Sequence, residues 1–148
     1  MKKKDNVKEL LVKDRFSKFE KISPKTIGVE IELPIINKNH NCIEMSNIQE
    51  LFKFLIDELD FNVEKKDNQG NVILLINENN GDKISLEYSE NTIEISLKED
   101  YNLYNLKSRF EKYVHFIQKE LNKFNYELQG EGINPNFKNI NRNCLDDD

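Results

Sequence analysis

Arginine and cysteine are scarce in this chain, and each scarcity excludes some of the functions that the protein could have. The sequence has three arginines, and its formal net charge is -5 at pH 7. Nucleic-acid surfaces are usually basic and rich in clustered arginine, so we expect no nucleic-acid partner. The two cysteines, Cys42 and Cys144, lie far apart and outside any C-x-x-C spacing. They are therefore predicted to be free thiols in a reducing compartment.

Long apolar runs and nucleotide-binding glycine motifs are also missing. The basic start, Met1 to Lys4, is followed by Leu and Val mixed with charged residues. We therefore expect no signal peptide, no membrane partner and a cytoplasmic location. No Walker A motif or kinase-type glycine-rich loop is present, which excludes the commonest nucleotide folds. The two histidines, His40 and His115, do not form a metal-ligand pair and are predicted to be structural or solvated.

The length of the chain predicts one soluble domain with a modest core. It has 148 residues, of which 37% are apolar and 33% charged. We divide it into an N-terminal helical segment at residues 1–24, a main domain at 25–140 and a polar tail at 141–148.

The most informative stretch is residues 26–36, Thr-Ile-Gly-Val-Glu-Ile-Glu-Leu-Pro-Ile-Ile. Its apolar residues fall at every second position, which predicts a strand with one buried face. The opposite face then carries two carboxylates, Glu30 and Glu32. They form either the solvated acidic face of a half-buried strand or a pair of oxygen ligands for a hard divalent cation.

The remaining apolar patterns predict an α+β domain. The spacing of apolar residues predicts amphipathic helices at 6–22, 47–59 and 103–124, the first with a packing role and the second with a capping box from Ser46 to Gln49. Alternating runs predict strands at 61–66, 72–77, 83–89 and 92–98, with one more near Tyr126 and Leu128. We expect an antiparallel, partly open sheet of five or six strands with the helices on its apolar face.

Two later strands repeat the arrangement of the first one. Glu87 and Glu94 lie opposite the apolar rows of their strands, so four carboxylates gather on one face if the strands share a sheet. A glycosidase-like acid and base pair could use such carboxylates. An excess of acids without His or Cys favours Mg2+ or Mn2+, which usually completes its shell with phosphate oxygens. ATP is the phosphate donor that we expect, and phosphoryl transfer is the reaction.

These residues also carry a family resemblance. The stretches Gly28-Val-Glu30-Ile-Glu32, Ile84-Ser-Leu-Glu87, Thr92-Ile-Glu94-Ile-Ser96 and Gly130-Glu-Gly132-Ile-Asn-Pro135 occur in order across residues 25–140. Together they resemble the opening part of the glutamate-cysteine ligase family of bacteria and plants. The resemblance implies a glutamine-synthetase-like catalytic sheet, and it implies that Glu30, Glu32, Glu87 and Glu94 hold Mg2+ against ATP.

The resemblance further implies an enzyme of glutathione synthesis. Its substrates would be glutamate, cysteine and ATP, and it would form gamma-glutamylcysteine through a gamma-glutamyl phosphate. Family members are much longer, so the chain is expected to correspond to an incomplete form that lacks the C-terminal portion or self-associates through an open sheet edge. The alternative is a non-catalytic scaffold or interaction domain that binds a divalent metal.

Overall fold

The computed structural model describes residues 25–87 and 89–130. The helix predicted at residues 6–22 and the polar tail at 141–148 lie outside these described residues. Both features therefore stay predictions, as does the division of the chain into three parts.

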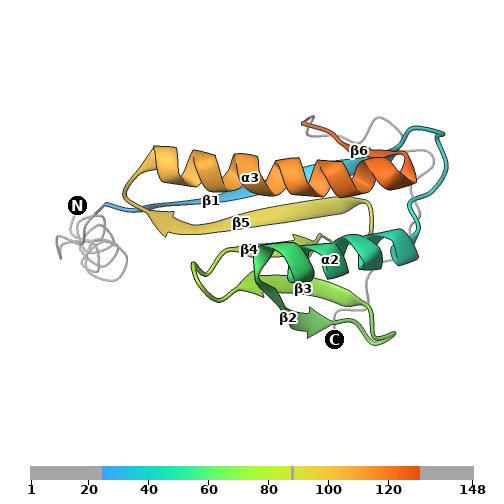
Figure 1. Cartoon of the computed structure of the whole chain (residues 1–148), viewed down its shortest axis with the longest axis horizontal. Helices are drawn as coiled ribbons and strands as arrows, with labels where there is room; N and C mark the ends of the chain where they lie inside the picture. The colour runs from blue at the N-terminus through green and yellow to red at the C-terminus, as the bar shows by residue number, and fades with distance from the viewer. Residues whose placement is uncertain (1–24, 88, 131–148) are drawn as a thin grey trace, which may run out of the picture.

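Six strands form one antiparallel sheet with the spatial order β2-β3-β4-β5-β1-β6 (Figure 1). The strands are β1 (Ile27–Asn37), β2 (Phe61–Lys66), β3 (Val72–Asn77), β4 (Lys83–Leu86), β5 (Thr92–Asp100) and β6 (Tyr126–Leu128). β2 to β5 follow one another as a meander, whereas β1 lies between β5 and β6. The predicted antiparallel, open sheet is confirmed. β4 ends at Leu86, before the predicted end at Ser89, although the Glu87 N–H still donates to the Thr92 oxygen of β5.

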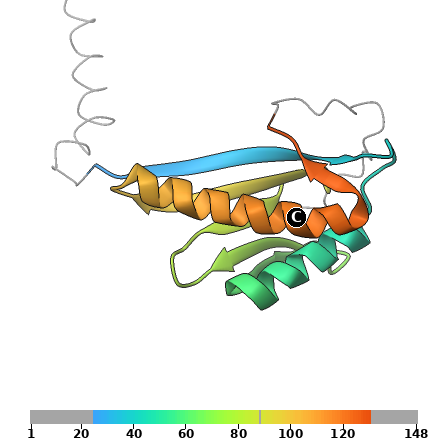
Figure 2. The ribbon, with the colours of Figure 1, turned by 45° about the horizontal axis from the view of Figure 1, so that its top comes forward.

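Two helices cover one face of this sheet. They are α2 (Met45–Leu59) and α3 (Leu103–Leu121), and α3 continues into a 3-10 turn, η3 (Asn122–Phe124). Figures 1 and 2 show both helices on the same side, with α3 along β5 and β6 and α2 along β2 and β3. Within residues 25–87 and 89–130, neither helix has the length and hydropathy that a bilayer crossing requires.

The hydrophobic core lies between the helices and the sheet. Its fully buried side chains come from both helices and from most strands, and they include Phe52, Leu55, Phe61, Leu75, Ile84, Ile93, Ile95 and Ile117. Each such side chain contributes roughly 1.5–3 kcal/mol by leaving water. The opposite face of the sheet is left for polar side chains, and the candidate site lies there.

β1 shows the predicted alternation from Gly28 to Glu32, whereas Ile27 at its start is 48% exposed instead of buried. Glu30 and Glu32 are exposed, while Val29 and Ile31 are half-buried on the helix side. From Leu33 to Asn37 every residue is buried, so the second half of the strand has no solvent face. Both carboxylates therefore stand on the part of β1 whose outer face is accessible.

The start of α2 differs from the predicted capping box. The helix begins at Met45, its N-cap residue is Glu44, and no side chain caps it. Gln49 has a different role, because its side-chain amide donates to the backbone oxygen of Val72 at 2.9 Å and its Oε1 accepts from the Val72 N–H at 2.7 Å. Gln49 thus fastens α2 to the start of β3 instead of closing the helix end.

A buried carboxylate anchors the turn between β3 and β4. Asp82 Oδ1 accepts hydrogen bonds from Arg109 Nη1 at 2.7 Å and from the Lys98 N–H at 2.8 Å. Asp82 Oδ2 accepts one from the Tyr113 hydroxyl at 2.8 Å. Arg109 and Tyr113 belong to α3 and Lys98 to β5. The network therefore ties the β3–β4 turn, β5 and α3 together, which fixes the two strands that carry most of the candidate site.

Candidate metal site

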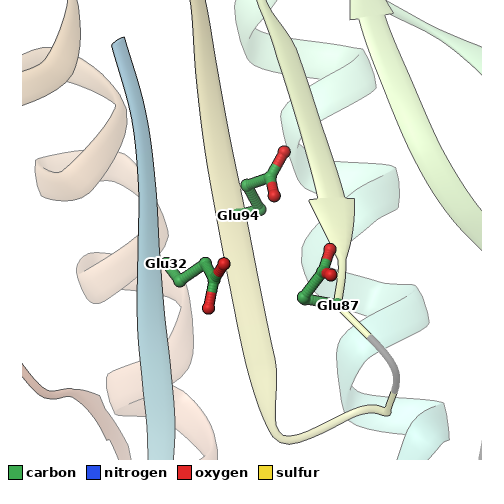
Figure 3. Close-up of side chains that lie close together, drawn as sticks. All are labelled: Glu32, Glu87 and Glu94. Atoms are coloured by element: carbon green, nitrogen blue, oxygen red, sulfur yellow. The ribbon is translucent and has the colours of Figure 1, made fainter. Parts of the chain in front are cut away.

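Three glutamates from three neighbouring strands converge on the face opposite the helices. They are Glu32 on β1, Glu87 directly after β4 and Glu94 on β5, and Figure 3 shows their side chains gathered on one side of the sheet. Each offers one carboxylate oxygen, and these three oxygens lie within 4.8 Å of one another. Glu32 is exposed, whereas Glu87 and Glu94 are half-buried. The structure thus brings together three of the four glutamates that the sequence singled out.

The closeness of Glu32 to Glu94 follows from strand register. The two residues are directly opposite in the β1–β5 pair. The Ile35 N–H donates to the Asn91 oxygen on the β5 side at 2.8 Å, so the odd-numbered residues of β1 bond toward β5. Glu32 and Glu94 therefore form a non-hydrogen-bonded pair, in which facing side chains come closest, with Cα atoms about 4.5 Å apart.

Glu87 reaches the same place from the other side of β5. Ser85 is paired with Glu94, and the Glu87 N–H donates to the Thr92 oxygen at 3.0 Å. Because side chains two residues apart share a face, Glu87 projects to the same side as Ser85 and Glu94. The β4–β5 connection thus carries one glutamate and β5 carries the other.

Glu30 is not part of the cluster. It lies opposite Ser96, two residues before Glu32 on β1, and its side chain is exposed. It lines a hollow of about 370 Å³ on the same face, which also borders Glu87 and Glu94 and two cations, Lys65 and Lys83. Glu30 is therefore placed to contact a molecule beside the three-glutamate cluster rather than to join it.

Ser96 is a site residue that the sequence analysis did not single out. Its hydroxyl donates to Glu94 Oε1 at 2.6 Å, which fixes that carboxylate oxygen. The sequence pattern that could have identified Ser96 is Thr92-Ile-Glu94-Ile-Ser96, because residues 94 and 96 of one strand share a face. A second missed feature is Lys83, whose Nζ forms an ion pair with Glu64 at 3.0 Å at the edge of the hollow.

The donor set fits a hard divalent cation. All three candidate ligands are carboxylate oxygens, the type that Mg2+, Mn2+ and Ca2+ prefer, and no described His or Cys joins them. Around one octahedral Mg2+, with each Mg–O distance about 2.1 Å, two ligand oxygens lie about 3.0 Å apart when adjacent and about 4.2 Å apart when opposite. Small side-chain rotations would bring oxygens that lie within 4.8 Å to that geometry.

Comparison of the chain with protein-family models, curated proteins and solved structures gave no match. The resemblance to the glutamate-cysteine ligase family therefore stays a prediction from sequence motifs, and the chemistry of the site rests on the residues described above.

Proposed function

We propose that this chain binds Mg2+ or Mn2+ through Glu32, Glu87 and Glu94 and belongs to an ATP-dependent carboxylate-amine ligase. The observation that carries the proposal is the convergence of three carboxylates from three strands to within 4.8 Å. Their mutual repulsion on one exposed face is offset when a cation binds between them. The motif resemblance to glutamate-cysteine ligases supplies the reaction class, which is ligation of glutamate to the amine of cysteine through a gamma-glutamyl phosphate.

The residues around the cluster have separate roles in this proposal. A bound cation would neutralise phosphate charge and align the donor with the acceptor. Glu32, Glu87 and Glu94 hold the cation, and the Ser96 hydroxyl holds Glu94 in the orientation required. Lys65 and Lys83 line the adjoining hollow, where an ammonium group can face a phosphate or a substrate carboxylate.

Metal binding is tested before turnover, because metal binding requires fewer protein side chains than catalysis does. Mn2+ binding to the full chain is followed by electron paramagnetic resonance, with the melting temperature measured with and without Mg2+. Glu94→Gln is expected to lose both responses, whereas Glu99→Gln, an exposed acid on the same strand, should keep them. Equal Mn2+ binding by wild type and Glu94→Gln would overturn the assignment of the site.

Turnover is tested by phosphate release from ATP, with glutamate and cysteine present together or singly, and by mass detection of gamma-glutamylcysteine. Release that needs both amino acids and disappears in Glu94→Gln would support a ligase. Metal binding without release would favour the second candidate function, a non-catalytic metal-binding scaffold. That candidate is supported by the cluster itself, because holding a cation requires only Glu32, Glu87 and Glu94.

A further inference from the structure

β5 carries a β-bulge near its end. On β1, Ile27 and Val29 are two positions apart, whereas their partners on β5 are three positions apart. Those partners are Asp100 and Leu97. One extra residue is therefore inserted in β5 opposite Gly28. Bulges of this kind bend a strand and re-aim its side chains, and they are over-represented beside functional sites.

The bulge turns two consecutive charged side chains to the same face of the sheet. Leu97 is buried on the helix side, and Asp100 also faces the helices, because its Oδ2 lies 3.8 Å from Arg109 Nη2 of α3. Between these two residues, Lys98 and Glu99 are both exposed and both line a hollow on the carboxylate face. Strict alternation after Leu97 would have sent Glu99 to the helix side. The extra residue thus places a cation and an anion side by side.

The backbone of the bulge is held by the buried ion pair of Asp82 and Arg109. The Lys98 N–H donates to Asp82 Oδ1 at 2.8 Å, and the Lys98 oxygen accepts from Arg109 Nη2 at 2.9 Å. Lys98 lies beyond Ser96, where the pairing of β5 with β4 ends, so these bonds replace the ladder there. The Lys98 side chain then crosses Gly81, since a Cβ atom at Gly81 would lie 3.4 Å from Lys98 Cγ. The lysine is thereby fixed at its backbone and along its stem.

The hollow beside the bulge has the size and the charges of a small-molecule site. Its volume is about 400 Å³, and such sites commonly measure about 300–1,000 Å³. Besides Lys98 and Glu99, it is lined by one further acid, Glu30 of β1, and one further base, Lys83 of β4. Two acids and two bases give the hollow no net charge. It therefore complements a ligand with one charge of each sign better than an anion or a metal ion.

The spacing of the charges across the hollow fits an α-amino acid. Glu30 is opposite Ser96, and Ser96 is opposite Lys83, so the three lie in one row across β1, β5 and β4. Neighbouring strands are about 4.8 Å apart, which puts the Cα atoms of Glu30 and Lys83 roughly 10 Å apart. Two long side chains that lean toward each other from this distance can grip a small group between them. The head of an α-amino acid, with ammonium and carboxylate joined through one carbon, is such a group.

We propose that this hollow binds the zwitterionic head of an α-amino acid. The ammonium group would contact Glu30 and Glu99, and the carboxylate would contact Lys83 and Lys98. The contact between Lys98 and Glu99 competes weakly, because Nζ and Oε1 are 3.9 Å apart and both side chains are more than half exposed. Lys83 pairs with Glu64 at 3.0 Å, and its ammonium group has further hydrogens to donate to a ligand.

The head site adjoins the glutamate cluster. Glu30, Lys83 and Ser96 line both this hollow and the one that borders Glu87 and Glu94. Ser96 and Glu94 are two residues apart on β5, so their positions on this face are about 7 Å apart. A side chain of two or three carbons that extends from the head along β5 therefore ends beside the cluster. This step rests on the proposed function, in which an acidic side chain would present its carboxylate to the bound cation.

The head site is tested without metal by titrating the full chain with L-norvaline, whose side chain is uncharged, and following backbone amide shifts by NMR. Shifts are expected at Gly28, Ser96 and Glu99. Pentanoate lacks the ammonium group of norvaline and butylamine lacks its carboxylate, so each is expected to bind at least about tenfold more weakly. Equal binding of either analogue would overturn the zwitterion site, and so would the absence of shifts at these residues.

Two variants separate the contribution of charge from that of space. Lys98→Met removes an ammonium group and is expected to weaken norvaline binding by about tenfold, whereas Lys53→Met, at an exposed position of α2, should leave it unchanged. Gly28→Val removes no charge, and the nearest atom to a Cβ there would be the Leu97 oxygen, at 3.8 Å. The added side chain would fill the hollow and is expected to abolish binding. Wild-type affinity in Lys98→Met or in Gly28→Val would show that norvaline binds elsewhere.

A second titration distinguishes this inference from the proposed function. Mg2+ is expected to tighten the binding of L-glutamate by about tenfold and to leave norvaline unaffected, because only glutamate brings a side-chain carboxylate to the cation. Glu94→Gln should abolish the Mg2+ effect and keep norvaline binding. Norvaline binding without any Mg2+ effect on glutamate would support the head site and count against the proposed function. Mn2+ binding without norvaline binding would keep the metal site and overturn the head site.

Discussion

Arg109 Nη1 lies 2.7 Å from Oδ1 of Asp82, a carboxylate whose side chain is fully buried. The Arg109 side chain is 21% exposed, and its Nη2 also donates to the backbone oxygen of Lys98 at 2.9 Å. The pair therefore joins α3 to the β3–β4 turn and to β5 at once. Since β5 carries Glu94, the orientation of the candidate site depends on an ion pair on the far side of the sheet.

We predict that Arg109→Met destabilises the fold by about 3 kcal/mol, because it leaves the buried Asp82 carboxylate without a cation. Asp82→Asn in the same chain should recover part of this loss, since the uncompensated charge is then gone. The measurement is the free energy of unfolding from urea denaturation of both single variants and the double variant. Strictly additive losses would show that the two side chains are not energetically coupled.

Tyr113 gives the fold a dependence on alkaline pH. Burial and the neighbouring Asp82 raise the pKa of Tyr113 to about 12, from an ordinary value near 10. The neutral phenol is thus the form that the folded state keeps. Stability from this group is complete below about pH 10 and is lost as the pH rises through 12.

Tyr113→Phe is accordingly expected to show a shallower loss of stability between pH 10 and 12 than the wild type. At neutral pH the variant should be weaker by about 1–2 kcal/mol, because the hydrogen bonds to Asp82 and Asn80 are gone. Urea denaturation across this pH range measures both effects. Parallel pH profiles for the two proteins would contradict the assignment.

Gln49 is predicted to be a stabilising link between α2 and β3. Gln49→Ala removes both hydrogen bonds to the Val72 backbone and should cost about 1–2 kcal/mol. Glu50→Ala, an exposed change at the next position of the same helix, is the control and should stay within about 0.5 kcal/mol. A shift in the urea midpoint of similar size for both variants would argue against a specific role for the two hydrogen bonds between Gln49 and Val72.

Ser96 is predicted to support metal binding without being a ligand. Ser96→Ala removes the donor that fixes Glu94 Oε1 and is expected to weaken Mn2+ binding by about tenfold, with little effect on stability. Ser85 lines the same hollow and lies opposite Glu94 on β4, so Ser85→Ala is a matched control that should change the affinity less. Equal affinities for Ser96→Ala and the wild type would reduce Ser96 to a surface residue.

The strands and helices of the described region could be predicted because their signals are local. Alternation in β1 and in β5 set one face apolar and one acidic, and the period of α3 marked its buried stripe. The capping box at α2 was wrong because Ser46 and Gln49 fit the local motif, whereas the Gln49 amide pairs with a backbone 23 residues away. Local patterns do not encode that competition.

The candidate site was predictable in part for the same reason. The alternation of apolar and polar residues in β1 places both Glu30 and Glu32 on the same face. Only the register of the β1–β5 pair decides which of the two lies opposite Glu94. Asp82 was missed altogether, because an acid after Asn-Asn-Gly reads as an exposed turn residue. Its burial depends on Arg109, which lies 27 positions later in the chain.

The sheet order also bears on how the protein folds. β2 to β5 are joined by short connections, so each hairpin can form early with little loop-closure cost. β1 must cross a long stretch of chain, α2 and the meander included, before it pairs with β5. We therefore expect Glu32 to reach its place beside Glu87 and Glu94 last during folding. A cation bound by all three glutamates would then stabilise only the completed domain, so it would slow unfolding more than it speeds folding.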